Sequence, residues 1–177
     1  MMQQRKIELR DIVIIGMLAA ICVIATTIKI PYGHGAMVHL GTAAIFTIGI
    51  VFGGVYAGLA AAIGTAFFDL MMGFCPYTIW SFFIKGTAGF VVGYVSKGLW
   101  PENIVPKQAL LRSIVGMLLA ATCTLAGYII AWWQVSGSIV VAIGNIPSSL
   151  ISSTVGFVVA SIIAPKLRQV LKNNRLI

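Results

Sequence analysis

Residues Gly64–Gly86 read GTAFFDLMMGFCPYTIWSFFIKG, a stretch that is almost entirely apolar yet holds two opposite charges, Asp69 and Lys85. Two longer stretches of the chain carry no charge at all. No Asp, Glu, Lys or Arg occurs from Ile30 to Phe68, and none occurs from Ser113 to Pro165. About 20 apolar residues cross a bilayer core once, and each charge-free gap has turn residues near its middle. Each gap therefore predicts two membrane spans.

The composition excludes a soluble fold, because 59% of the residues are hydrophobic and only 9% are charged. Soluble domains carry roughly a quarter charged residues. The apolar runs are continuous and do not alternate with polar residues, which favours helices over a β-barrel. We expect an all-α integral membrane protein, a single domain over residues 1–177, with six spans in one bundle. The expected spans are residues 11–30, 39–52, 56–73, 79–97, 109–133 and 139–164.

The net charge of +8 indicates membrane topology and not nucleic-acid binding, because the basic residues gather on one side of this model. Both termini are therefore predicted to be cytoplasmic, and the basic residues can also attract anionic lipid headgroups. No glycine-rich motif for ATP binding is present, so we do not expect this chain to hydrolyse ATP. Ten of the twelve Lys and Arg residues lie on the predicted cytoplasmic side: Arg5, Lys6, Arg10, Lys97, Lys107, Arg112, Lys166, Arg168, Lys172 and Arg175.

Asp69 and Lys85 are predicted at similar depth on neighbouring spans, so they can pair across the hairpin. A charge in the bilayer centre costs about 3 kcal/mol or more, so each needs a partner or a polar cavity. Three interpretations stay open: an ion pair that sets the register of the two spans, direct contact with a ligand, or a role in movement.

Histidines flank the first outer loop, at His34 and His39. A metal site is disfavoured because no Cys, Asp or Glu stands near them. Hydrogen bonding to a ligand or to the loop itself is the better interpretation. Gly33 and Gly35 would let the segment Pro31–Val38 act as a lid, although a simple mobile connection explains them equally well.

Aromatic and polar residues collect on the same outer side. The aromatic ones fit either an interfacial belt or a wall that stacks on a flat heterocycle. Asn145, before Pro147, can donate and accept hydrogen bonds to a ligand, or it can satisfy backbone groups at a helix start. The candidates for substrate binding are His34, His39, Asp69, Tyr77, Trp80, Lys85, Tyr128, Trp132, Asn145 and Ser148.

An intramembrane hydrolase would need a Ser-Lys pair such as Ser81 and Lys85, but no further catalytic group is evident and no catalytic residue is assigned.

Several segments resemble the substrate-binding S components of energy-coupling factor (ECF) vitamin transporters. They are VHLGTAAIF, VFGGVYAGLAAAIGTAFFDLMMG, TIWSFFIKGTAGFVVGYV and GNIPSSLISSTVG, preceded by a basic start and an alanine-rich first helix. The similarity covers nearly the whole chain and points to the riboflavin-type branch, which also includes carriers for pyridoxine, hydroxymethylpyrimidine and pantothenate-like compounds. It implies six helices, an outward-facing pocket under the first outer loop, and vitamin binding without hydrolysis.

The resemblance also implies partners: a T subunit and two ATPases that supply the energy. In that family the first helix meets the T subunit through a small-xxx-small patch, which Gly16 and Ala20 occupy here. The family's sixth helix has Asn followed three residues later by a longer polar residue. Here Ser148 follows Asn145, which argues against a pocket built around a long side chain, as for riboflavin.

We therefore expect a bacterial cell-membrane protein that binds a small water-soluble vitamin or precursor and carries no cofactor or metal. Pyridoxine-like compounds or hydroxymethylpyrimidine are favoured, then pantothenate, whose carboxylate Lys85 could attract, then riboflavin. A stand-alone secondary transporter or channel is the alternative.

Overall fold

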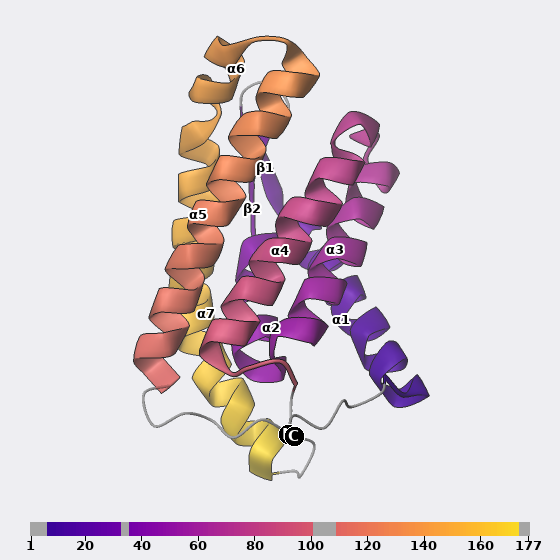
Figure 1. The fold of residues 1–177 in the computed structure, drawn as a ribbon, viewed down its shortest axis with the longest axis vertical. Helices are drawn as coiled ribbons and strands as arrows, with labels where there is room; N and C mark the ends of the chain where they lie inside the picture. The colour runs from indigo at the N-terminus through magenta and orange to yellow at the C-terminus, as the bar shows by residue number, and fades with distance from the viewer. Residues whose placement is uncertain (1–6, 33–35, 101–108, 174–177) are drawn as a thin grey trace, which may run out of the picture.

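The computed structural model describes residues 7–32, 36–100 and 109–173. In these ranges the chain is helical apart from one short β-hairpin (Figure 1), so the predicted helical class is confirmed. In chain order the elements are α1 (Leu9–Thr27), β1 (Lys29–Tyr32), β2 (Ala36–His39), α2 (Gly41–Phe52), α3 (Gly54–Met71), the 3-10 turn η1 (Cys75–Tyr77), α4 (Thr78–Ser96), α5 (Ala109–Ser136), α6 (Ile139–Gly144) and α7 (Ile146–Asn173).

Five helical segments of the described chain are long and apolar enough to cross a membrane. They are α1, α3, η1 with α4, α5, and α6 with α7. The remaining helix, α2, has 12 residues. At about 1.5 Å per residue it is about 18 Å long, well short of the roughly 30 Å bilayer core. Length and composition thus support five spans, and the second predicted span, residues 39–52, corresponds to the shorter apolar helix α2.

The first outer connection is longer than the predicted loop Pro31–Val38, and it takes residues from the ends of both neighbouring predicted spans. The helix ends at Thr27 and not at Ile30, because Pro31 disfavours helical backbone at the residue before it. Residues 29–32 instead pair antiparallel with residues 36–39, with Lys29 opposite His39. His39, predicted as the first residue of the second span, is therefore the last residue of a strand.

The last predicted span, residues 139–164, is divided in the structure. Helix α6 ends at Gly144 and α7 begins at Ile146. Pro147 explains the break, because it has no N–H to donate to the carbonyl four residues earlier. Helix α7 then runs on to Asn173, nine residues past the predicted end.

Helix α2 lies at the centre of the bundle and is buried along almost its whole length. It packs against α7, α4, α1 and α3. Glycines make the close helix contacts possible: a Cβ at Gly93 would lie 2.5 Å from the carbonyl carbon of Gly53, and one at Gly89 would lie 2.5 Å from the carbonyl oxygen of Ala57. The recurring small residues on α3 and α4 are therefore packing positions.

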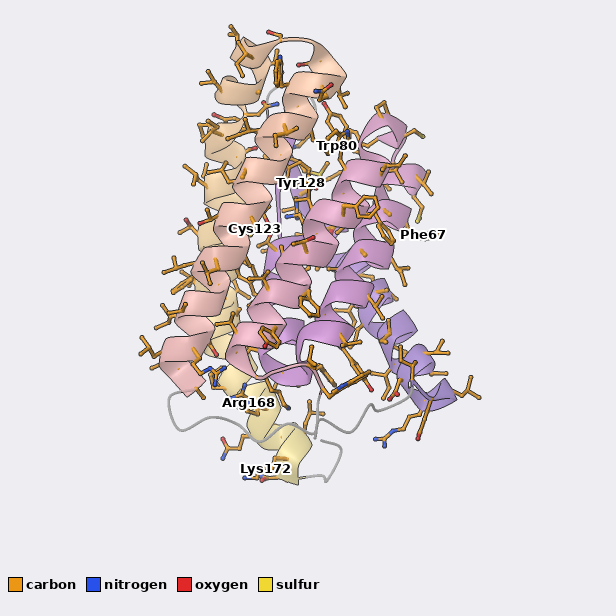
Figure 2. All side chains as sticks on the ribbon, in the orientation of Figure 1. Phe67, Trp80, Cys123, Tyr128, Arg168 and Lys172 are labelled. Atoms are coloured by element: carbon orange, nitrogen blue, oxygen red, sulfur yellow. The ribbon has the colours of Figure 1, made fainter. Side chains whose placement is uncertain are left out.

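The two ends of the bundle differ in chemistry. The hairpin and α6 lie at one end, whereas Arg168 and Lys172 lie at the other, which is also the end where α1 begins (Figures 1 and 2). At that basic end two cations bond to the last carbonyls of α2. Lys97 donates to the carbonyl of Val51 at 2.7 Å, and Arg168 donates to the carbonyl of Ile50. Cations are favourable there because the helix C-terminus carries partial negative charge.

Candidate substrate-binding site

One cavity opens beneath the hairpin, at the end of the bundle away from the basic residues. Its empty volume is about 630 Å³, counted out to the solvent at its mouth. The lining side chains come from every element around the centre: Thr26, Ala36, Met37, His39, Thr42, Thr65, Phe68, Asp69, Phe74, Tyr77, Ser81, Lys85, Thr124, Tyr128, Trp132, Ser148, Ser149, Ser152 and Ser153.

The lining residues recur at four-residue spacing, so each helix turns a single face to the cavity. Thr65 and Asp69 show this spacing on α3, Ser81 and Lys85 on α4, and Ser148 and Ser152 on α7. Roughly half of the lining residues are Ser or Thr, whose hydroxyls both donate and accept hydrogen bonds. The wall is thus polar enough to hold a water-soluble molecule inside an apolar protein.

Asp69 and Lys85 line this cavity but do not form an ion pair in the described part of the chain. The Lys85 ammonium donates to the Thr42 hydroxyl at 3.3 Å and lies 5.3 Å from the centre of the Tyr128 ring. The Oδ2 atom of Asp69 is buried and accepts no hydrogen bond from any described residue. The side chains of both residues are more than nine-tenths buried. Within the described residues, α3 and α4 are therefore not joined by a direct salt bridge between Asp69 and Lys85.

A short chain of hydroxyls lies beside these charges. The Ser81 hydroxyl is 2.9 Å from the Tyr128 hydroxyl, and it also interacts with the Asp69 carboxylate. Figure 2 shows Tyr128 on α5 at the side that faces α4. Ser81 is thus engaged with a tyrosine and an aspartate, and the Lys85 ammonium bonds elsewhere. The arrangement suits ligand binding better than a Ser-Lys nucleophile.

His39 connects the hairpin to the cavity floor. Its Nδ1 accepts a hydrogen bond from the backbone N–H of Gly41 at 3.1 Å, and its own backbone N–H donates to Ser152 on α7 at 3.3 Å. Burial, together with the nearby positive charges of Lys85 and Lys29, lowers the pKa of His39 to about 3. The ring is therefore neutral at pH 7, and because Nδ1 accepts, the proton sits on Nε2.

The hairpin is held on both strands. On β2, Ala36 packs in an apolar cluster with Trp132 of α5 and Ala142 of α6. On β1, the Lys29 ammonium lies over two cavity-lining rings, 4.6 Å from the centre of Phe68 and 5.0 Å from that of Phe74. The rings attract the cation through their negative faces. The hairpin thus forms one wall of the cavity.

Seven predicted residues line the cavity together: His39, Asp69, Tyr77, Lys85, Tyr128, Trp132 and Ser148. Trp80 does not, because it precedes Ser81 by one residue and so points about 100° away around the α4 axis. Asn145 is buried in the break between α6 and α7 and is not a lining residue. Its backbone carbonyl instead accepts a hydrogen bond from the Ser148 hydroxyl at 2.7 Å. His34 lies outside the described residues.

Sequence reasoning missed most of the hydroxyl residues and two rings, Phe68 and Phe74. The serines of α7 carried a signal, since the run SSLISS at residues 148–153 repeats serine at spacing four. Phe68 and Phe74 carried none, because apolar residues are the rule in every predicted span. Only the packing of α3 against α1 and α4 selects which of them reach the cavity.

The predicted partner patch, Gly16 and Ala20, lies on the outer face of α1. Both residues are exposed, and a Cβ at Gly16 would meet no atom within 4 Å. This distinguishes Gly16 from the glycines of α3 and α4, which meet neighbouring backbone. The patch is therefore available to another surface.

Comparison with known proteins identifies the family. A model for the family described as "ECF-type riboflavin transporter, S component" matches residues 6–169 of the chain. The chain belongs to this family. It is therefore a transporter S component and not an enzyme, which excludes the intramembrane hydrolase considered above and confirms the resemblance seen in the sequence.

Two further proteins are similar to this chain. A solved structure described as "Structure and mechanism of the S component of a bacterial ECF transporter" has a TM-score of 0.62, with 18% identity over 93% of this chain and 96% of that one. This likeness shows a shared S-component fold. An "Uncharacterized protein in gap 3'region" from Pyrococcus woesei is 28% identical over 102 residues, which span 58% of this chain and 62% of that protein, less than two thirds of its length.

Proposed function

We propose that this S component captures a small water-soluble vitamin, or a vitamin precursor, from outside the cell for ATP-driven uptake by partner subunits. The observation that carries the proposal is the cavity: hydroxyls, aromatic rings and two charges without a salt bridge among the described residues line one space that opens from a mostly apolar bundle. A membrane protein without a ligand would have no use for such a space, because buried polar groups are costly unless they are bonded.

The proposed topology places both termini in the cytoplasm and the cavity toward the outside. The described basic residues at the end away from the hairpin support this orientation by the positive-inside rule. They are Arg10, Lys97, Arg112, Lys166, Arg168 and Lys172. Six membrane segments fit if the 12-residue helix α2 takes the place of one full crossing, and the hairpin then lies toward the outside as one wall of the cavity.

The favoured substrates are pyridoxine-like compounds or hydroxymethylpyrimidine, then pantothenate, then riboflavin. Tyr77, Tyr128 and Trp132 supply flat surfaces for a small heteroaromatic ring. Ser148 is short and its hydroxyl bonds back to the Asn145 carbonyl, so it contributes no long polar arm to a larger ligand. Pantothenate remains a candidate because its carboxylate can accept a hydrogen bond from the Lys85 ammonium.

The proposed partners are an ECF T subunit and two ATPase subunits, with the T subunit on the outer face of α1. Exposed Gly16 and Ala20 allow a partner helix to approach the α1 backbone closely. Energy must come from such partners if uptake is driven by ATP, because this chain carries no ATP-binding motif.

The test is a binding screen of the purified chain against water-soluble vitamins and their precursors, followed by uptake in cells. We expect one small-ring compound to bind tightly and to raise the melting temperature, as any ligand specific for the folded state must. Uptake should disappear when the partner ATPases are deleted. Uptake that survives this deletion would favour the stand-alone transporter, and binding of no vitamin would refute the proposal.

A further inference from the structure

Among the described residues, Asp11 and Lys97 are buried charges at the basic end with close hydrogen bonds, whereas Asp69 and Lys85 in the cavity are less completely bonded; the basic end also holds a buried donor without a partner, Nε of Arg168. At the basic end, both carboxylate oxygens of Asp11 are bonded: Oδ1 accepts from the Tyr56 hydroxyl at 2.5 Å and Oδ2 from the backbone N–H of Glu8 at 2.9 Å. Lys97 likewise donates to a carbonyl at 2.7 Å. In the cavity, Asp69 Oδ2 has no partner among the described residues, and the only hydrogen bond described for Lys85 is one of 3.3 Å to a hydroxyl.

This difference matters because an ammonium offers three donors and a carboxylate about four acceptor positions. Leaving such capacity unused in a buried site is costly, and native proteins satisfy nearly all of it. The protein has the means to satisfy buried charges, as Asp11 and Lys97 demonstrate. The unmet capacity of Asp69 and Lys85 therefore points to something that binds both and is not part of the chain.

We propose that the ligand completes both groups, so that it is a bipolar molecule with a hydrogen-bond donor edge for Asp69 and an anionic or acceptor oxygen for Lys85. This inference rests on the proposed vitamin-binding function and narrows its substrate class. It also gives the two charges separate roles, one for each end of the ligand, and these replace a mutual ion pair.

The spacing of the groups fits a single ring. Ser81, which interacts with Asp69, and Lys85 lie one turn apart on α4, about 6 Å along the helix axis. Tyr128 contacts both ends, through its hydroxyl to Ser81 and through its ring to the Lys85 ammonium. His39 adds a neutral Nε2–H donor near Lys85. A small heteroaromatic ring with a protonated or amino nitrogen and an oxygen-bearing substituent meets these groups at once, whereas a purely anionic chain has no donor for Asp69 and a sugar has no flat ring to stack on Tyr128.

The experiment compares cavity variants with matched variants of the satisfied charges. Asp69→Asn, Lys85→Met and the double variant are measured beside Asp11→Asn and Lys97→Met, each as full-length protein in detergent. The probes are pyridoxine, hydroxymethylpyrimidine, pantothenate and riboflavin. For pyridoxine, two analogues are added: one with the ring nitrogen replaced by C–H, and one without the 3-hydroxyl.

We expect Asp69→Asn and Lys85→Met each to weaken binding of the preferred probe at least tenfold, with the two control variants near the wild-type affinity. If pyridoxine is that probe, Asp69→Asn should lose little further affinity for the analogue without the ring nitrogen, and Lys85→Met little for the analogue without the 3-hydroxyl. Equal affinity of wild type and both cavity variants would overturn the inference. It would also be overturned if the loss from each variant simply added to the loss from the analogue that lacks its proposed contact.

Stability without ligand gives a second reading that does not depend on the proposed function. The double variant should melt at or above the wild-type temperature, because it removes two incompletely bonded charges, whereas Asp11→Asn and Lys97→Met should melt lower. A double variant that melts as low as the controls would assign the charges a structural role and refute the inference. If no probe binds wild type, the proposed vitamin function fails, and this melting comparison still decides the role of the charges.

Discussion

The substitution Gly89→Ala tests whether close contact between α3 and α4 supports the site. A Cβ at Gly89 would lie 2.5 Å from the carbonyl oxygen and 2.8 Å from the carbonyl carbon of Ala57, both backbone atoms that cannot rotate away. Ordinary contact begins at 3.4 Å, so the two helices must separate locally by roughly 1 Å. Gly89 lies one turn from Lys85, so the displacement reaches the cavity.

The magnitude follows from two opposing effects. Overpacking costs about 1–3 kcal/mol, whereas replacing glycine by alanine inside a helix gains up to about 1 kcal/mol. We expect a net loss of up to about 2 kcal/mol in the free energy of unfolding, together with weaker ligand binding. Gly16→Ala is the matched control, since it has the same gain in helix propensity and no atom within 4 Å of the new Cβ.

Thermal or denaturant unfolding of the purified variants provides the measurement. At a scale of about 2–4 °C per kcal/mol for a chain of this size, the two variants should differ by several degrees in opposite directions. A Gly89→Ala protein as stable as Gly16→Ala would show that the α3–α4 contact is looser than described, and the packing argument would fail.

Three further predictions concern the hairpin and the partner surface. Lys29→Met should destabilise the position of β1 by about 1 kcal/mol, because the cation–π contacts are lost, and should speed protease cleavage within residues 29–39. The exposed control Lys172→Met should change neither, and equal cleavage rates of the two variants would contradict the contact. Because the pKa of His39 is about 3 in the folded protein and near 6.5 when unfolded, stability should fall as pH drops from about 6.5 toward 3, and a His39→Gln melting series that keeps the same slope would refute this. Gly16→Leu and Ala20→Leu should abolish uptake while leaving vitamin affinity unchanged, and lost affinity would contradict a partner role.

Much of the architecture was predictable because lipid imposes strict rules on sequence. Continuous apolar runs predicted helices, and the expected ranges for residues 56–73, 79–97 and 109–133 differ by only a few residues from α3, α4 and α5. The ends near Pro31 and Pro147 were missed. There the backbone chemistry of one proline outweighed the hydropathy of its neighbours.

The candidate site was predictable where polarity is rare. Asp69 and Lys85 stood out because no other charge lies near them in sequence, and both line the cavity. Their relationship was not predictable. Sequence spacing allowed a salt bridge between neighbouring helices, whereas in the structure Lys85 reaches across to Thr42 on α2.

Hydropathy, charge and local motifs in the sequence were enough to predict a membrane location, the helical class, the family and the two charges most suited to a ligand. These depend on composition and local order, which hydropathy and charge encode residue by residue. Helix packing was needed to place α2 at the centre, to bring hydroxyls from α2, α3, α4, α5 and α7 together beneath the hairpin, and to leave Asp69 and Lys85 in one cavity with no salt bridge in the described part of the chain. Those facts depend on the rotation and depth of each helix against its neighbours, which the contacts of Gly53, Gly89 and Gly93 set at the level of single atoms.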